Sequence, residues 1–166
     1  HELQSHLEIL QKNGEIIAQW DVLSGFAQSA VKYNYCRPEW TTQTNFFIQG
    51  ARHPVIEQQL DPGSPYISND LSIDREAQQI LMITGPNMSG KSALLRQTAL
   101  IALMAQMGSF VPATKATLSI VDKIFTRVGA SDNISMGAST FMVEMNETAS
   151  ILNNISERSL VLLDEI

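Results

Sequence analysis

The sequence predicts an α/β fold with a mainly parallel β-sheet. One observation is an apolar run, Leu81–Thr84, that reads as a buried strand and leads into a glycine-rich turn and a helical pattern. Another is the apolar run Leu160–Leu163, which ends in two carboxylates. Near-continuous apolar strands are typical of parallel sheets covered on both faces. Ligands of such sheets bind beyond the carboxyl ends of the strands, where Asp164 and Glu165 would lie.

The turn after the first run fits the phosphate-binding pattern G-x-x-x-x-G-K-[ST]. Its glycines let main-chain N–H groups wrap a phosphate, and the N-terminus of the next helix adds a favourable field for an anion. Lys91 would reach the β- and γ-phosphates, and the Ser92 hydroxyl would bind Mg²⁺. The predicted nucleotide-binding residues of this P-loop are Gly85, Pro86, Asn87, Met88, Ser89, Gly90, Lys91 and Ser92. The sequence therefore predicts a P-loop NTPase that uses ATP or ADP with Mg²⁺.

Asp164 and Glu165 suit two roles beside such a nucleotide. Asp164 would hold Mg²⁺ directly or through water. Glu165, next to it and pointing the other way, would act as a base or orienter for the attacking water. The second predicted catalytic residue is Lys91, through its contact with the phosphates. An apolar run that ends in Asp-Glu is common by itself. Its position after a P-loop favours the functional interpretation.

The composition describes an ordinary globular protein, with 44% hydrophobic and 17% charged residues among 166. The net charge of −6 excludes a global basic field that would draw this chain to nucleic acid. A single cysteine, Cys36, predicts a reduced structural thiol. No signal peptide is visible, and the apolar stretch Thr98–Ala105 is too short to span a bilayer, so we expect a cytoplasmic protein without membrane contact. Because the first residue is His1 and the last follows an acidic pair, we expect part of a longer protein.

The first 34 residues are predicted to be mostly helical, because apolar residues recur at three- and four-residue steps. Gly14 predicts a bend or a break in this helix. Pro38 disfavours helix in the residue before it. We therefore divide the chain into a helical segment, residues 1–35, and the first part of an α/β domain, residues 36–166.

The middle of the chain alternates short strands with turns. Phe46–Gln49, interrupted at Gly50, and Tyr66–Ser68 are predicted strands, and Asp70–Gln78 is a predicted polar turn. The segment Arg52–Val55 could be a functional turn, although a lone histidine in such a place is more often structural.

After the P-loop the predicted elements are longer. Ser89–Met107 is a predicted helix with Gly108 as its stop. Ala116–Val121 reads as a strand, and Lys123–Val128 is ambiguous between a strand and a short helix. Phe141–Ile155 is a predicted helix.

Ser139 lies just before that last helix and is its expected N-cap. One interpretation is an ordinary cap. The other is a second anion site, in which a hydroxyl and a helix N-terminus clamp the γ-phosphate of a nucleotide held by a partner subunit. Spacing alone leaves both open.

Several blocks of residues together carry a family resemblance. They are Thr84–Met88 with the Gly90-Lys91-Ser92 that follows, Leu95–Gln97, Phe110–Ala113, Ile124–Ala130, Ser139–Met145 and Leu163–Glu165. They resemble the ATPase domain of the MutS family of bacterial DNA mismatch-repair proteins, from about Tyr35 to Ile166. The leading helix resembles the end of that family's lever region.

This resemblance implies an ABC-type ATPase fold that works as a homodimer through the ATPase domain. Each composite site would take its P-loop from one subunit and Ser139 from the other, and Tyr66 would stack on adenine where Phe is common. ATP binding and hydrolysis would switch the clamp of the parent protein on mismatched double-stranded DNA. The resemblance also implies a MutL-type partner and a nucleoid-associated location. The mismatch reader of the family does not occur in this chain.

The sequence departs from the family pattern at a few positions. Ser89 stands where Gly or Ala is usual, Ala93-Leu94 replaces a common Thr-Tyr pair, and Ala138 replaces a residue that is often charged. None of these changes touches a phosphate-contacting role. The change at Ala138 bears on the contact in trans.

Two other functions make different demands on the sequence. A small-molecule kinase would need a lid over a phosphate acceptor and a base for an incoming hydroxyl, and the sequence offers neither. A scaffold or interaction module would need no catalytic residues. Because a composite site is incomplete within one chain, we expect weak or no ATP turnover from this chain alone.

Overall fold

The computed structural model of the 166-residue chain describes residues 6–61, 63–86, 88–127 and 140–164. Its elements are α1 (Leu7–Lys32), β1 (Glu39–Trp40), β2 (Asn45–Ala51), α2 (Ile56–Gln59), β3 (Asn69–Asp74), α3 (Lys91–Gln106), β4 (Lys115–Leu118), β5 (Lys123–Arg127), α4 (Thr140–Asn154) and β6 (Ser159–Leu163). None of the helices within these ranges is long and apolar enough to cross a membrane.

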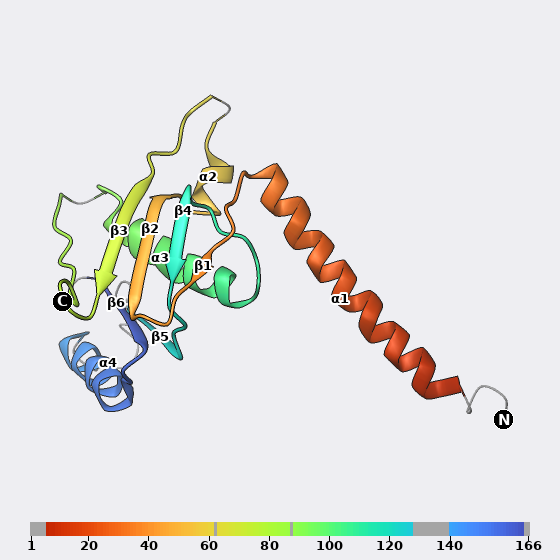
Figure 1. The fold of residues 1–166 in the computed structure, drawn as a ribbon. Helices are drawn as coiled ribbons and strands as arrows, with labels where there is room; N and C mark the ends of the chain where they lie inside the picture. Colours follow the sequence, from red (N-terminus) through yellow and green to blue (C-terminus); the bar gives the residue numbers. More distant parts are fainter. Residues whose placement is uncertain (1–5, 62, 87, 128–139, 165–166) are drawn as a thin grey trace.

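The larger sheet is mixed, with the strand order β1-β4-β2-β3 (Figure 1). Only β1 and β4 run parallel; β2 is antiparallel to both β4 and β3. The prediction of a mainly parallel sheet is therefore wrong for this part of the chain. The physical reason lies in β2, where the buried Phe46 and Ile48 alternate with the exposed Phe47 and Gln49. That alternation is typical of an antiparallel sheet with one open face.

The smaller sheet pairs β5 with β6 in parallel, and the register sets Arg127 opposite Leu163. This confirms the strand predicted from the apolar run Leu160–Leu163. It also resolves the ambiguous segment after Asp122 as a strand that ends at Arg127.

One hydrophobic core joins both sheets to α3. The predicted helix is found, with its start two residues later than expected: α3 begins at Lys91 and ends at Gln106. The predicted stop, Gly108, has a positive φ of 89°. The core residues come from β2, β3, β4, β6, α3 and the segment before β4, namely Phe46, Ile48, Ala51, Leu71, Ala99, Ile101, Ala102, Ala105, Val111, Ala113, Ala116, Leu118, Leu160 and Leu162. This packing holds the middle and end of α3 against the sheets.

Two predicted strands are not found where the sequence placed them. Leu81–Thr84 belongs to no sheet of the described residues, and Met82 is 83% exposed. A strand needs a hydrogen-bonded neighbour, and an apolar run cannot by itself specify one. Tyr66–Ser68 also lies outside the strands, which resume at Asn69. The predicted turn over Asp70–Gln78 is wrong up to Asp74, because β3 pairs there with β2.

Helix α1 is a single helix of 26 residues that projects away from the body of the chain (Figure 1). The break predicted at Gly14 is therefore wrong. A glycine inside a helix costs only about 1 kcal/mol relative to alanine, which a long helix tolerates. The apolar residues of α1 are mostly exposed, and Ala30 alone is buried among its residues.

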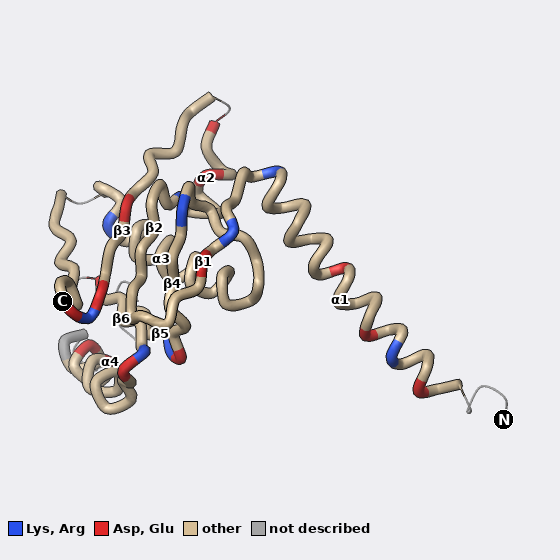
Figure 2. Tube along the Cα trace, viewed as in Figure 1, with Lys and Arg blue, Asp and Glu red and all other residues tan. Residues whose placement is uncertain are grey.

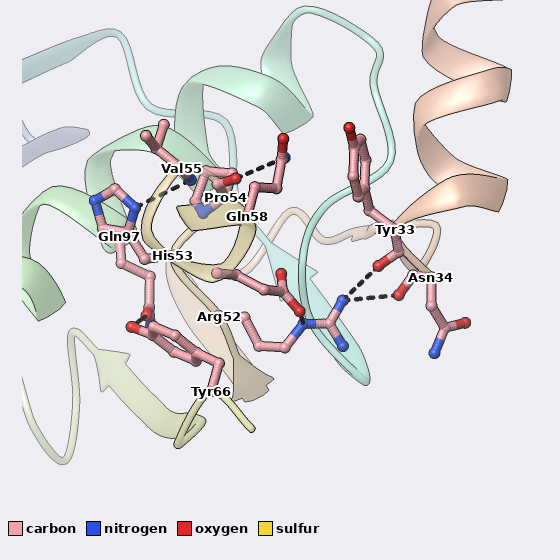
Figure 3. Close-up of polar contacts among 10 residues, drawn as sticks. Tyr33, Asn34, Arg52, His53, Pro54, Val55, Gln58, Tyr66 and Gln97 are labelled. Carbon is pink, nitrogen blue, oxygen red and sulfur yellow. Dashed lines mark hydrogen bonds and ion pairs between the residues drawn. The ribbon is translucent and has the colours of Figure 1, made fainter. Parts of the chain in front are cut away.

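The end of α1 is joined to the body by Arg52. Its guanidinium donates to the carbonyl oxygens of Tyr33 and Asn34, both at 2.9 Å, and forms an ion pair with Glu57 at 2.8 Å (Figure 3). The domain boundary near residue 35 stays a prediction.

Candidate nucleotide-binding site

Two residues of the loop Gly85–Ser92 have a positive φ, a main-chain conformation that residues other than glycine rarely adopt. Gly90 has φ 91° and Met88 has φ 64°, and Met88 is fully exposed. A Cβ atom on Gly85 would lie 3.0 Å from the Ser89 hydroxyl oxygen. The loop turns back on itself at Ser89, whose N–H donates to the Pro86 carbonyl at 3.3 Å.

Lys91 reaches across this loop. Its ammonium donates to the carbonyl oxygens of Gly85 at 2.7 Å and Pro86 at 2.9 Å. The helix that begins at Lys91 therefore holds a positive charge over the turn that precedes it. An ammonium in this position is available to the oxygens of a bound phosphate.

The main-chain N–H groups at the N-terminus of α3 are not bonded by the side chain of an N-cap residue. Its N-cap is Gly90, so there is no side-chain cap, and its first turn contains no acidic residue. The free N–H groups and the positive end of the helix favour an anion here. Ser92 lies in this first turn. A helix start of this kind favours an anionic group such as a phosphate.

Asp164 follows directly on β6 and is 8% exposed. Side chains alternate between the two faces of a strand, so Asp164 shares a face with Leu160 and Leu162. Those two leucines belong to the same core as α3, and β6 contacts α3. Asp164 therefore lies on the α3 side of the smaller sheet.

The described residues contain no cluster of three His, Cys, Asp or Glu side chains that could hold a metal ion by themselves. Mg²⁺ rarely needs such a cage, because it takes one or two protein oxygens together with phosphate oxygens and water. Ser92, in the first turn of α3, and Asp164, directly after β6, are the predicted ligands of such an ion. Their hydroxyl and carboxylate oxygens are the ligands that Mg²⁺ prefers.

Tyr66 lies in the segment before β3 and is tied to α3. Its hydroxyl donates to Oε1 of Gln97 at 2.9 Å, and Gln97 is almost fully buried (Figure 3). Burial raises the pKa of the Tyr66 hydroxyl. The tyrosine predicted to stack on adenine is thus fixed to the helix that starts at the P-loop.

His53 has a structural position close to Tyr66. It is 6% exposed, and its Nδ1 accepts a hydrogen bond from the N–H group of Val55 at 3.2 Å (Figure 3). The same Nδ1 accepts the N–H group of Ile56, also at 3.2 Å. These bonds cap the start of α2. They support the structural interpretation of the turn Arg52–Val55.

We expect His53 to make the fold less stable in weak acid. Burial, and then the positive charge of Arg96, lower the pKa of His53. The unfolded chain then binds the proton more readily, so this contribution to stability is full above a pH of about 6.5 and is lost as the pH falls below it. In thermal unfolding, His53→Asn should show a smaller drop in Tm between pH 7 and pH 5 than the natural chain. His6→Asn, at an exposed histidine, is the control and should show the full drop; an equal drop in both variants would contradict this account.

Two residues beside the site were missed by the sequence analysis, which gave them no role. Gln97 orients Tyr66, and nothing in its sequence neighbourhood signals a partner 31 positions away. Arg127 is 6% exposed and forms ion pairs with Glu144 at 2.9 Å and Glu147 at 3.2 Å. The signal for Arg127 was available: a basic residue at the end of a strand, followed by two acidic residues three apart on the next helix.

Three predicted site residues, Asn87, Ser139 and Glu165, lie outside the described residues. The helix predicted after Ser139 is confirmed as α4, Thr140–Asn154. Figure 2 shows Lys and Arg interspersed with Asp and Glu along the described chain, with no extended basic run. This agrees with the absence of a global basic field.

Comparisons with known proteins give a consistent result. Residues 81–166 match the family model "MutS domain V". The chain is 67% identical over 164 residues to the DNA mismatch repair protein MutS of Christiangramia forsetii and 66% identical over 164 residues to that of Flavobacterium johnsoniae. It is 58% identical over 165 residues to that of Porphyromonas gingivalis. Each match covers 99% of this chain but only 18–19% of the relative, so the chain spans about a fifth of these curated proteins.

Proposed function

This chain belongs to the MutS family of DNA mismatch-repair proteins, and we propose that its loop Gly85–Ser92 binds the phosphates of ATP and ADP in the full-length protein. The observation that carries this proposal is the position of Lys91. Its ammonium lies over the loop at 2.7 Å and 2.9 Å from two loop carbonyls, beside a helix N-terminus without a side-chain cap. A positive charge next to an uncapped helix N-terminus is an arrangement that favours a bound anion, which supports the proposal.

Ser92 and Asp164 would hold Mg²⁺ at this site. When bound, the ion would neutralise charge on the phosphates and polarise them for attack by water. The Ser92 hydroxyl is in the first turn of α3, and the Asp164 carboxyl is on the α3 side of β6. Glu165 would orient the attacking water or accept its proton. The adenine would stack on Tyr66, which Gln97 holds in place.

The full catalytic site would be composite. Ser139 of a second subunit would complete it, so the ATPase would work as a homodimer joined through this domain. Nucleotide can control the parent protein only by binding one arrangement of the dimer more tightly than another. We propose that this selection sets the clamp state on mismatched double-stranded DNA and the contact with a MutL-type partner, in the bacterial cytoplasm at the nucleoid.

The test is nucleotide binding by the full-length protein with Lys91→Ala. A charge-assisted hydrogen bond contributes roughly 1.5–3 kcal/mol, so affinity for ATP should fall by about 10- to 100-fold. Binding is measured by titration with a fluorescent ATP analogue. Lys115→Ala removes an exposed lysine of β4 and is the matched control, with affinity unchanged. Normal ATP binding by Lys91→Ala would refute the proposed function.

A further inference from the structure

The side chain of Arg127 is held between β5 and α4. It is 6% exposed, and its guanidinium forms ion pairs with Glu144 Oε1 at 2.9 Å and Glu147 Oε2 at 3.2 Å. The two glutamates are three residues apart on α4 and so lie on the same face of the helix. A buried guanidinium depends on such partners, because its charge is costly to bury without them.

The main chain of Arg127 is paired with the residue that follows β6. Arg127 lies opposite Leu163 in the parallel register, and its carbonyl oxygen accepts the N–H of Asp164 at 2.8 Å. This is the next backbone bond after the last paired residues of the smaller sheet. The position of the Asp164 backbone is therefore set by the position of Arg127.

The two side chains leave the sheet on opposite faces. Residues in register share a face, so the Arg127 side chain projects with Leu163 towards α4. Asp164, one position further, projects with Leu162 towards α3. The guanidinium therefore acts on Asp164 through the main chain and not by direct contact.

We propose that Arg127 is a positioning residue for Asp164 as a ligand of Mg²⁺. Glu144 and Glu147 fix the Arg127 side chain, and the Arg127 carbonyl fixes the end of β6. The inference rests on the proposed function, because the role of Asp164 is assigned there. It adds that the ion pairs of Arg127 with Glu144 and Glu147, on the α4 face of the smaller sheet, set the metal affinity of Asp164 on the α3 face.

The same strand provides a matched control. Lys123, at the start of β5, donates from Nζ to the Asn154 carbonyl at the end of α4, at 2.8 Å. Helix α4 is thus bound to β5 by two basic side chains, Lys123 at the start of the strand and Arg127 at its end. Only the Arg127 end adjoins Asp164. General loosening of α4 and specific misplacement of Asp164 can therefore be separated.

The test uses Mn²⁺ as a substitute for Mg²⁺. Its affinity for the ADP complex of the full-length protein is measured by electron paramagnetic resonance. Changing a residue that orients a metal ligand typically costs 10- to 100-fold in metal affinity, so we expect a loss of about tenfold in Arg127→Met. The double variant Glu144→Gln/Glu147→Gln should show a similar loss, and Arg127→Lys a smaller one. Lys123→Met should bind Mn²⁺ as the natural protein does. ADP affinity in EDTA should be unchanged in all of these variants.

Natural Mn²⁺ affinity in both Arg127→Met and the double variant would overturn this inference, and so would an equal loss in Lys123→Met. If Arg127→Met does not fold, the double variant decides, because it keeps the arginine and changes only partly exposed residues. Failure of the proposed function gives a different result. In that case the natural protein itself would bind no ADP, whatever stands at position 127.

Discussion

Asp164→Asn is expected to reduce ATP turnover by the full-length protein by about 100-fold or more. The substitution keeps the size of the side chain and removes the negative charge that would hold Mg²⁺. A metal ion supplies several kcal/mol of charge stabilisation in phosphoryl transfer, and each 1.4 kcal/mol is a factor of ten in rate. Nucleotide binding in EDTA should be unaffected, since the phosphate contacts come from Gly85–Ser92. Turnover is measured by phosphate release at saturating ATP and Mg²⁺.

Asp122→Asn is the control for this change. Asp122 lies just before β5, and its carboxylate accepts a hydrogen bond from the Ser156 hydroxyl. The same chemical change at this exposed residue should leave turnover within about twofold of the natural protein, as for most surface changes. Natural turnover in Asp164→Asn would show that this carboxylate does not hold the metal.

Ile101→Ala is expected to destabilise the fold by about 3 kcal/mol. Ile101 is fully buried on α3, within the core that joins both sheets. Truncation of a buried isoleucine to alanine costs 2–5 kcal/mol, because apolar contacts are lost and a cavity remains. The free energy of unfolding is measured by urea denaturation. The loss should also weaken nucleotide binding at 37 °C, because α3 carries Lys91 and Ser92.

Leu103→Ala tests whether burial is the cause. Leu103 lies two residues further along α3 and is about half exposed. Its truncation should cost less than about 1 kcal/mol, since little cavity is created. Equal destabilisation by the two variants would contradict the placement of the core.

Elements with strong local signals were predicted well. Helix α3 has a 3.6-residue apolar pattern and a glycine stop, and Thr98 and Ile101 on this helix are buried. Strand β6 is an apolar run of the right length, and β2 was located within two residues at each end. Helix α4 lies within one residue of its prediction at each end. These signals depend on nearby residues only.

Sheet pairing was predicted poorly because it depends on partners distant in sequence. The run Leu81–Thr84 looks like a buried strand, but apolar residues alone do not name a neighbouring strand. The parallel sheet was inferred from two such runs. It was wrong for the larger sheet, whose antiparallel core is β4-β2-β3. Gly14 was given too much weight, since one glycine does not end a helix of 26 residues.

The candidate site shows the same division. The motif predicted which residues form the loop, and their roles stay predictions. The contacts that orient them come from residues with no motif, such as Gln97 and Arg127, whose partners lie 31 positions away for Gln97 and 17 and 20 for Arg127. Residues with a chemical role can be predicted from a short local motif. The residues that orient them can be found only from contacts between segments distant in sequence.

The most direct measurement is a structure of the full-length protein with ADP and Mg²⁺. We expect the diphosphate to lie in the loop Gly85–Ser92, within hydrogen-bonding distance of Lys91 Nζ and the first N–H groups of α3. The metal should lie between the Ser92 hydroxyl and the Asp164 carboxylate. A diphosphate bound away from this loop, or a metal with no link to Asp164, would contradict the account.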